Sequence, residues 1–134
     1  MRYVIAYCAI AASLVISASS RAGTVAPAST LRADVAEWSI VPSTGAVPAG
    51  RVRIAVRNFG TTTHQVLLVR TGSFGARLRL HGSHAAVSNV FGSVLVKPGA
   101  RASFTVSLKP GSYLLLDNLP WHYWKGTSAA FTVR

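Results

Sequence analysis

The sequence predicts an all-β protein built as an antiparallel β-sandwich. Short segments of alternating apolar and polar residues recur along the chain, turn residues separate them at regular intervals, and no long amphipathic helical pattern occurs. A chain of 134 residues is expected to form one domain. These segments predict about seven or eight short strands, a number that is typical of a β-sandwich.

The first segment is predicted to be a secretory signal peptide. Arg2 precedes an apolar run over residues 3–16, and small residues follow from 17 to 22. A basic start, an apolar core and a small-residue cleavage zone form the order of such a signal. We therefore expect residues 1–22 to be removed and the protein to be secreted, periplasmic or on the cell surface. The apolar run is shorter than the ~20 residues of a transmembrane helix, and an uncleaved N-terminal anchor is the alternative, which would give the only contact with a membrane.

The rest of the chain is divided into a flexible lead-in over residues 23–33 and a β domain over residues 34–134. Turn regions are expected at residues 42–50 and in the Lys-Pro-Gly sequences at 97–99 and 109–111, since Pro sets φ and Gly accepts positive φ. Residues 71–93 have no clear period. The expected strands are residues 35–40 with Trp38 as a core anchor, 51–58, 64–70, 93–96, 102–108, 113–116 and 129–133.

Composition excludes several kinds of chemistry. Cys8 is the only cysteine and lies in the signal segment, so the mature chain has neither a disulfide nor a thiolate. Without Arg2 and Arg21, 12 basic residues face three acids, a formal charge of +9. This charge favours anionic partners. Arginines that alternate with apolar residues over 51–57 are interpreted first as a solvent-facing strand surface, and export makes nucleic acid an unexpected target.

Two distant segments carry a family resemblance. The first is Asn58-Phe-Gly-Thr-Thr-Thr-His64, which an apolar strand follows. The second is the C-terminal loop, in which Pro120 and His122 follow Tyr113 by seven and nine residues. These segments resemble the cupredoxins, in which a mid-sequence His and a C-terminal loop reading Tyr…Cys…Pro-Gly-His…Gly-Met meet at one end of the sandwich.

The resemblance implies a cupredoxin-like Greek-key antiparallel β-sandwich and a copper site. His64 and His122 match the two His ligands. Asp117 stands at the Cys position, Thr127 at the Met position and Trp121 at the Gly before His. Blue copper electron transfer is therefore not expected, because a hard carboxylate favours Cu(II) or Zn(II) over Cu(I) and gives no thiolate charge transfer.

His64, Asp117 and His122 are thus predicted to bind one copper ion in a type-2 N₂O site, which Thr127 or water would complete. The alternative is that no metal binds. In that case Asp117 caps the loop through backbone N–H groups or accepts hydrogen bonds from the histidines.

The surface around His122 is predicted to contact a partner. Trp121, Tyr123 and Trp124 surround this residue, and Lys125 would suit an acidic protein or an anionic surface. Packing of these rings against the end of the sandwich is the alternative. A metal-free interaction module that uses this surface is the second functional hypothesis.

The remaining histidines and hydroxyls suggest no enzyme. His81 and His84 lie in a Gly- and Ser-containing segment and are expected to be exposed and inert. Ser128 could combine with a histidine and Asp117, but no nucleophile elbow or oxyanion loop accompanies them. Catalysis is not expected.

Overall fold

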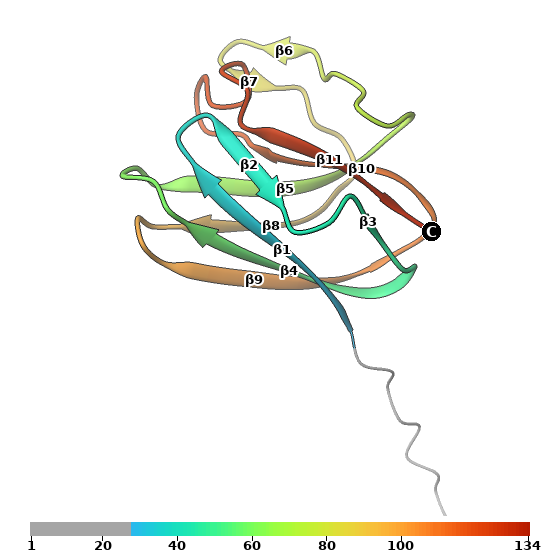
Figure 1. Ribbon diagram of the computed structural model, residues 1–134. Coiled ribbons are helices and arrows are strands. Elements are labelled where there is room, and N and C mark those ends of the chain that lie inside the picture. Colours follow the sequence, from blue (N-terminus) through green and yellow to red (C-terminus); the bar gives the residue numbers. More distant parts are fainter. Residues whose placement is uncertain (1–27) are drawn as a thin grey trace, which may run out of the picture.

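The computed structural model describes residues 28–134 as an all-β domain (Figure 1). The predicted signal peptide and residues 23–27 lie outside the described residues. Within residues 28–134, no helix is long and apolar enough to span a membrane.

Two sheets face each other as layers (Figure 1). The four-stranded sheet has the order β2-β1-β4-β9, and the five-stranded sheet has the order β3-β11-β10-β5-β8. The first sheet contains β1 (Ser29–Ala36), β2 (Ser39–Pro42), β4 (Gly50–Asn58) and β9 (Arg101–Leu108). The second contains β3 (Ala46–Val47), β5 (His64–Thr71), β8 (Val90–Val96), β10 (Gly111–Asp117) and β11 (Ser128–Val133). A separate hairpin is formed by β6 (Leu80–His81) and β7 (His84–Ala85).

The pairing of the strands confirms an all-β sandwich but corrects one expectation. Most neighbours are antiparallel, as predicted, but β1 pairs with β4 and β3 pairs with β11 in parallel. The sandwich is therefore mixed. Each parallel pair joins strands that are not consecutive along the chain, which alternation of apolar and polar residues does not reveal.

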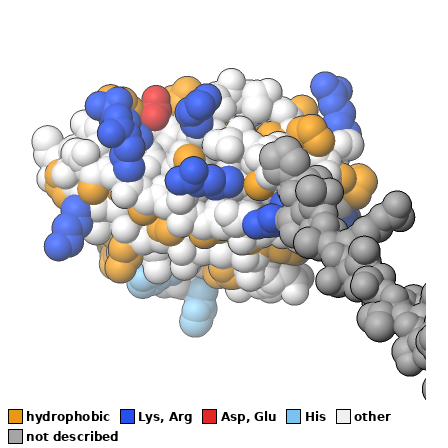
Figure 2. Space-filling view, turned by 90° about the horizontal axis from the view of Figure 1, so that it is seen from below, with side chains coloured by type: hydrophobic (Ala, Val, Ile, Leu, Met, Phe, Trp, Pro, Cys, Tyr) orange, Lys and Arg blue, Asp and Glu red, His pale blue; other side chains and the backbone are white. Residues whose placement is uncertain are grey.

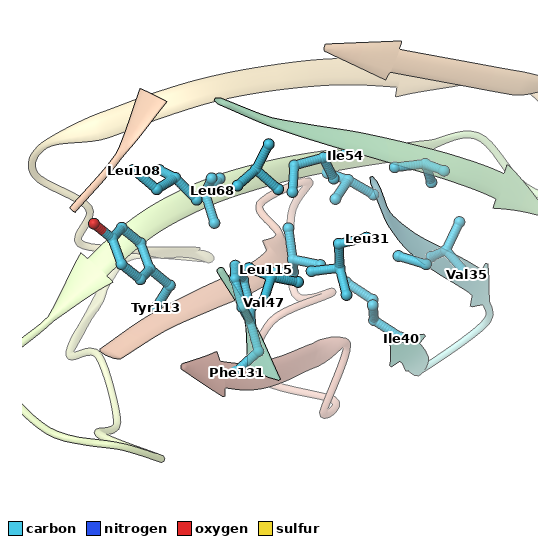
Figure 3. Close-up of a cluster of buried hydrophobic side chains, with 14 of the residues drawn as sticks. Leu31, Val35, Ile40, Val47, Ile54, Leu68, Leu108, Tyr113, Leu115 and Phe131 are labelled. Atoms are coloured by element: carbon cyan, nitrogen blue, oxygen red, sulfur yellow. The ribbon is translucent and has the colours of Figure 1, made fainter. Parts of the chain in front are cut away.

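The core lies between the two sheets and follows from this alternation. Along β1, Leu31, Ala33 and Val35 are buried while the residues between them are exposed, because successive side chains point to opposite faces. Tyr113 is fully buried, and its hydroxyl donates a hydrogen bond to the Lys109 carbonyl at 2.8 Å. Figure 3 shows Leu31, Val35 and Tyr113 between the strands. Others that line the same core are Ile40, Val47, Ile54, Leu68, Leu108, Leu115 and Phe131.

Two expectations for the N-terminal part of the domain are wrong. The lead-in does not extend through residue 33, because β1 begins at Ser29. Residues 35–40 are not one strand but the end of β1, a turn at Glu37 and Trp38, and the start of β2. Trp38 is no core anchor: its side chain is 43% exposed and its φ is 64°. A turn that needs positive φ takes this residue out of the alternating pattern.

The other expected strands are present with shifted ends. β5, β9, β10 and β11 each match a predicted segment within two residues, whereas β8 begins three residues early. β3 lies in the expected turn region at residues 42–50, and β6 and β7 lie in the irregular segment 71–93. These three elements have two residues each, which is too short for a sequence pattern.

Candidate metal centre

Three ligand-type side chains converge at one end of the sandwich. His64 begins β5, and Asp117 ends β10, the strand beside it. His122 lies in the loop between β10 and β11. The ligand atoms of these residues all lie within 4.8 Å of one another. The structure thus brings together the two segments, 53 residues apart, that the sequence singled out.

The Asp117 carboxylate is the centre of the cluster. Its Oδ2 lies 2.6 Å from Nδ1 of His64 and 2.7 Å from Nδ1 of His122. Because a carboxylate oxygen only accepts hydrogen bonds, each ring must carry its proton on Nδ1 to donate. Its Oδ1 accepts from the backbone N–H groups of Gln65 and Leu119 at 3.2 and 2.9 Å. Asp117 therefore ties β5 to the C-terminal loop, as the alternative interpretation of this residue expected.

Two buried polar atoms of the described part have no hydrogen-bond partner. They are Nε2 of His64 and Oγ1 of Thr127. The Thr127 carbonyl accepts from Asp117 N at 2.9 Å, and its N–H donates to the His122 carbonyl at 3.2 Å. The residue at the expected fourth position is therefore held between the other ligand candidates, with its hydroxyl fully buried and unpaired.

Glu37 is a second carboxylate beside the cluster. Its Oε1 lies 4.0 Å from Nε2 of His64, beyond hydrogen-bond distance. The same oxygen accepts hydrogen bonds from the backbone N–H groups and hydroxyls of Thr61 and Thr62. Its own backbone N–H, and then those of the two threonines, lower its pKa to about 2. The carboxylate is therefore charged and fixed next to the unpaired nitrogen.

The loop before His64 is shaped to receive Glu37. The Asn58 side chain donates to the carbonyls of Thr62 and Val96 at 2.8 and 2.9 Å, and its oxygen accepts from Gly60 N at 2.8 Å. A Cβ on Gly60 would lie 2.5 Å from the Glu37 carboxylate. Gly60 thus leaves free the space that the Glu37 carboxylate occupies.

Aromatic rings form the rim of the site. The Trp38 ring meets the His122 ring edge to face at 5.3 Å, and the ammonium of Lys125 lies 3.9 Å from the centre of the Trp38 ring. Trp121 and Trp124 are 52% and 64% exposed and lie edge to face at 6.3 Å. Trp121 has a φ of 68°, so the residue at the family's Gly position keeps a left-handed backbone that Gly would adopt without strain.

Of the four predicted contact residues, Tyr123 packs inward. It joins a second apolar cluster with Leu67 and Leu116, and its hydroxyl accepts a hydrogen bond from Leu78 N at 2.8 Å. Trp121, Trp124 and Lys125 are exposed. The partner itself stays a prediction.

His81 and His84 stand apart from the cluster. They face each other across the β6–β7 hairpin, and both are exposed, as expected.

Sequence reasoning missed Glu37 and Trp38. Both lie in the turn between β1 and β2, which places them against His64 and His122. No local pattern marks them, because their role depends on how this hairpin meets two loops that are distant in sequence. The one available signal was the rarity of acids: the chain has three, and two of them lie here.

The residues present fit a divalent metal ion. Two imidazole nitrogens and a carboxylate oxygen form a donor set that Cu(II) and Zn(II) accept. These atoms already point at one another, and an ion among them would replace the two Nδ1 protons. The unpaired Nε2 of His64 faces a carboxylate, as ligating histidines usually do.

No family model matches the sequence, and neither does any curated protein. Solved structures do match. Reduced auracyanin from the photosynthetic bacterium Roseiflexus castenholzii is similar with a TM-score of 0.60 at 22% identity, over 81% of this chain and 99% of its own. Auracyanin B matches with a TM-score of 0.59 at 19% identity, over 81% and 90%. Rusticyanin from Thiobacillus ferrooxidans matches with a TM-score of 0.57 at 13% identity, over 81% and 79%. The chain therefore has a cupredoxin-like fold, as the resemblance implied.

Proposed function

We propose that this chain is an exported cupredoxin-like protein that binds one Cu(II) ion through His64, Asp117 and His122. The observation that carries the proposal is the convergence of two Nδ1 atoms on one buried carboxylate oxygen, at 2.6 and 2.7 Å. Rusticyanin, a structural neighbour, is a copper protein. The predicted signal peptide supports a location outside the cytoplasm, where the protein would store, deliver or sense the metal.

The distribution of charge supports a cation site. The formal net charge of the chain is +11, from 14 basic residues and three acids. Two of those acids, Glu37 and Asp117, lie at the cluster. A cation is therefore attracted to the cluster although the net charge of the molecule repels it. A bound cation would also offset the free-energy cost of burying the Asp117 carboxylate.

Each residue has a distinct role in this proposal. His64 and His122 supply neutral nitrogen ligands, and Asp117 supplies a charged oxygen. His64 must carry its proton on Nε2 when Nδ1 binds metal, and the charged Glu37 carboxylate, 4.0 Å away, would favour that tautomer electrostatically. The Thr127 hydroxyl or water completes the coordination. Bound Cu(II) would supply a type-2 centre without the thiolate absorption of blue copper. The role is binding rather than catalysis.

Calorimetric titration of the purified protein with Cu(II), followed by electron paramagnetic resonance, tests the proposal. We expect a single ion per chain, a type-2 spectrum and no intense blue colour. His122→Ala removes a ligand and should weaken binding by more than about tenfold, the smallest loss typical of removing even an outer-shell partner. The matched control is His81→Ala/His84→Ala, which removes two exposed histidines and should leave the titration unchanged.

Two results would contradict the proposal. One is unchanged Cu(II) binding in a His64→Ala/His122→Ala variant that still folds, as judged by circular dichroism. The other is loss of binding in the His81→Ala/His84→Ala control, which would place the ion on the hairpin.

A metal-free interaction module is the second candidate. It is favoured by the exposed Trp38, Trp121 and Trp124 around His122, since large exposed aromatic patches mark contact sites. The hydrogen bonds of Asp117 also satisfy the ligand atoms without an ion. An acidic protein or anionic surface would then bind at the rim. This candidate predicts the same melting temperature with and without chelator, and association that weakens steeply with salt.

A further inference from the structure

The outer face of the four-stranded sheet gathers arginines from three strands. Figure 2, a view from below Figure 1, shows Lys and Arg side chains spread over the visible surface and very little acidic surface. Along β4, arginines alternate with the buried Val52, Ile54 and Val56, so they share the outer face. All are exposed, and they are Arg32 on β1, Arg51, Arg53 and Arg57 on β4, and Arg101 on β9.

These strands form a hollow of about 400 Å³ centred on a small residue. Ala55 lies opposite Arg32 on one side and Ser103 on the other. Arg53 and Arg57 lie two residues before and after Ala55 on the same face, about 13 Å apart along the strand. The long arginine side chains therefore surround the short side chains of Ala55 and Ser103, which form the bottom of the hollow. Four arginines (Arg32, Arg53, Arg57 and Arg101) and one acid, Asp34, line the hollow, a formal net charge of +3.

A structural role does not account for this arrangement. Arg57 and Arg101 are directly opposite in the β4–β9 ladder, and like charges in that position destabilise a sheet. Across residues 28–134, where all three acids lie, no arginine forms an ion pair with a carboxylate. Asp34 is opposite Arg57 on β1, yet it too makes no such pair. Serine or threonine in place of these arginines would keep the strand surface polar without repulsion between like charges.

Two of the guanidinium groups are already held in place. Nε and Nη2 of Arg53 donate to the Ser103 hydroxyl at 3.2 and 3.1 Å. The Arg57 guanidinium lies 4.1 Å from the centre of the Phe59 ring. Ordering a long side chain before a ligand arrives reduces the entropy that binding must overcome.

We propose that this hollow is a binding site for a phosphate group, seated over Ala55 among Arg32, Arg53 and Arg57. Guanidinium groups match phosphate oxygens in geometry and bind them through paired charge-assisted hydrogen bonds. The group is carried either by a soluble phosphate compound or by a phospholipid headgroup. The site lies on the four-stranded sheet, whereas Asp117 ends β10 of the five-stranded sheet, and it does not depend on metal.

The first test is a titration of the purified protein with inorganic phosphate and with pyrophosphate at constant ionic strength, followed by backbone amide chemical shifts. We expect the largest shifts at Ala55 and Ser103. Arg53→Gln/Arg57→Gln should weaken binding by about tenfold or more, the effect of losing a charged hydrogen bond. Arg77→Gln/Arg79→Gln is the matched control: it removes the same charge from exposed residues elsewhere and should change binding less than about twofold.

The second arm distinguishes the source of the phosphate. Sedimentation with phosphatidylglycerol vesicles, compared with phosphatidylcholine vesicles, measures headgroup binding. Binding to phosphatidylglycerol that is lost in Arg53→Gln/Arg57→Gln identifies a lipid headgroup, whereas binding to soluble phosphate alone identifies a soluble ligand. The proposal is overturned if the two arginine pairs weaken binding equally, or if the shifts scatter over the whole basic surface.

Discussion

Glu37 is a partly exposed carboxylate whose ionisation is controlled by hydrogen bonds from backbone N–H groups. Hydrogen bonds from its own N–H and those of Thr61 and Thr62 lower its pKa from 4.5 to about 2. Folding therefore favours the charged form of Glu37. Two of the residues that lower its pKa, Thr61 and Thr62, lie more than 20 residues away in the sequence. The fixed charge links the turn after β1 to the loop that leads into His64.

The pH dependence of stability should report this link. A carboxyl whose folded pKa is depressed stabilises the protein above its unfolded pKa, and this contribution is lost as pH falls through the folded value. Wild type should thus exceed Glu37→Gln in free energy of unfolding above about pH 5, and the difference should vanish as pH falls from 4.5 to about 2. Urea denaturation over this range measures it.

Asp34→Asn supplies the control for that experiment. It removes an exposed carboxylate that has no ion pair in residues 28–134. If the difference in free energy of unfolding between wild type and Glu37→Gln stayed constant down to pH 2, the backbone hydrogen bonds would not be what lowers the pKa of Glu37.

At the scale of elements, β8 and β9 come together at one edge of the sandwich through a glycine. A Cβ on Gly92 would lie 2.4 Å from the ring of Phe104 on β9. The ring of one sheet therefore lies directly on the backbone of the other. Gly92 is opposite Leu68, where the register of β5 and β8 shifts, so the close contact and the irregular ladder occur at the same point.

Gly92→Ala should destabilise the protein by about 1–3 kcal/mol, because the added methyl group must displace the Phe104 ring from a packed position. Chemical denaturation measures the change. Gly45→Ala is the control, since no atom lies within 4 Å of its Cβ position. Its free energy of unfolding should equal or exceed that of wild type, or fall below it by less than about 1 kcal/mol. Failure of Gly92→Ala/Phe104→Leu to recover any of the loss would contradict this steric explanation.

The strands were predictable where a local pattern persists for several residues. β5 and β10 are apolar runs, and β4 and β9 alternate, so each was located from its own residues. Trp38 is expected as a core anchor because residues 35–40 are predicted to form one strand. The structure instead uses it in a turn with positive φ, where its ring covers His122, a tertiary role that no local pattern encodes.

At the scale of the whole molecule, the candidate site joins segments that the chain brings together only on folding. The resemblance of two segments to the cupredoxins implied that His64, Asp117 and His122 meet, because in that family the two segments lie at the same end of the sandwich. The contribution of Glu37 and the arginine-lined hollow could not be predicted in this way. Both depend on pairings between β1, β4 and β9, which periodicity does not specify.

Because the ligands meet only in the folded state, metal should stabilise the whole domain. At a free Cu(II) concentration 100 times Kd, the gain is about 2.7 kcal/mol. The melting temperature should then rise by on the order of 10 °C for a domain of this size. Scanning calorimetry with Cu(II) and with chelator measures the shift. His122→Ala should abolish most of it, and an equal rise in that variant would indicate binding elsewhere.

The burial of the candidate ligands has a consequence for the rate of exchange. The side chains of His64 and Asp117 are 0% exposed, whereas that of His122 is 15% exposed. Of the three candidate ligands, His122 alone therefore has exposed side-chain surface, and the Trp38 ring lies edge to face against it. We expect the entry of a metal ion to need opening of the loop between β10 and β11, a motion of nanoseconds to microseconds or slower. Uptake should consequently reach a ceiling set by the loop rather than rise without limit with metal concentration, and a bound ion should leave slowly even under strong chelation.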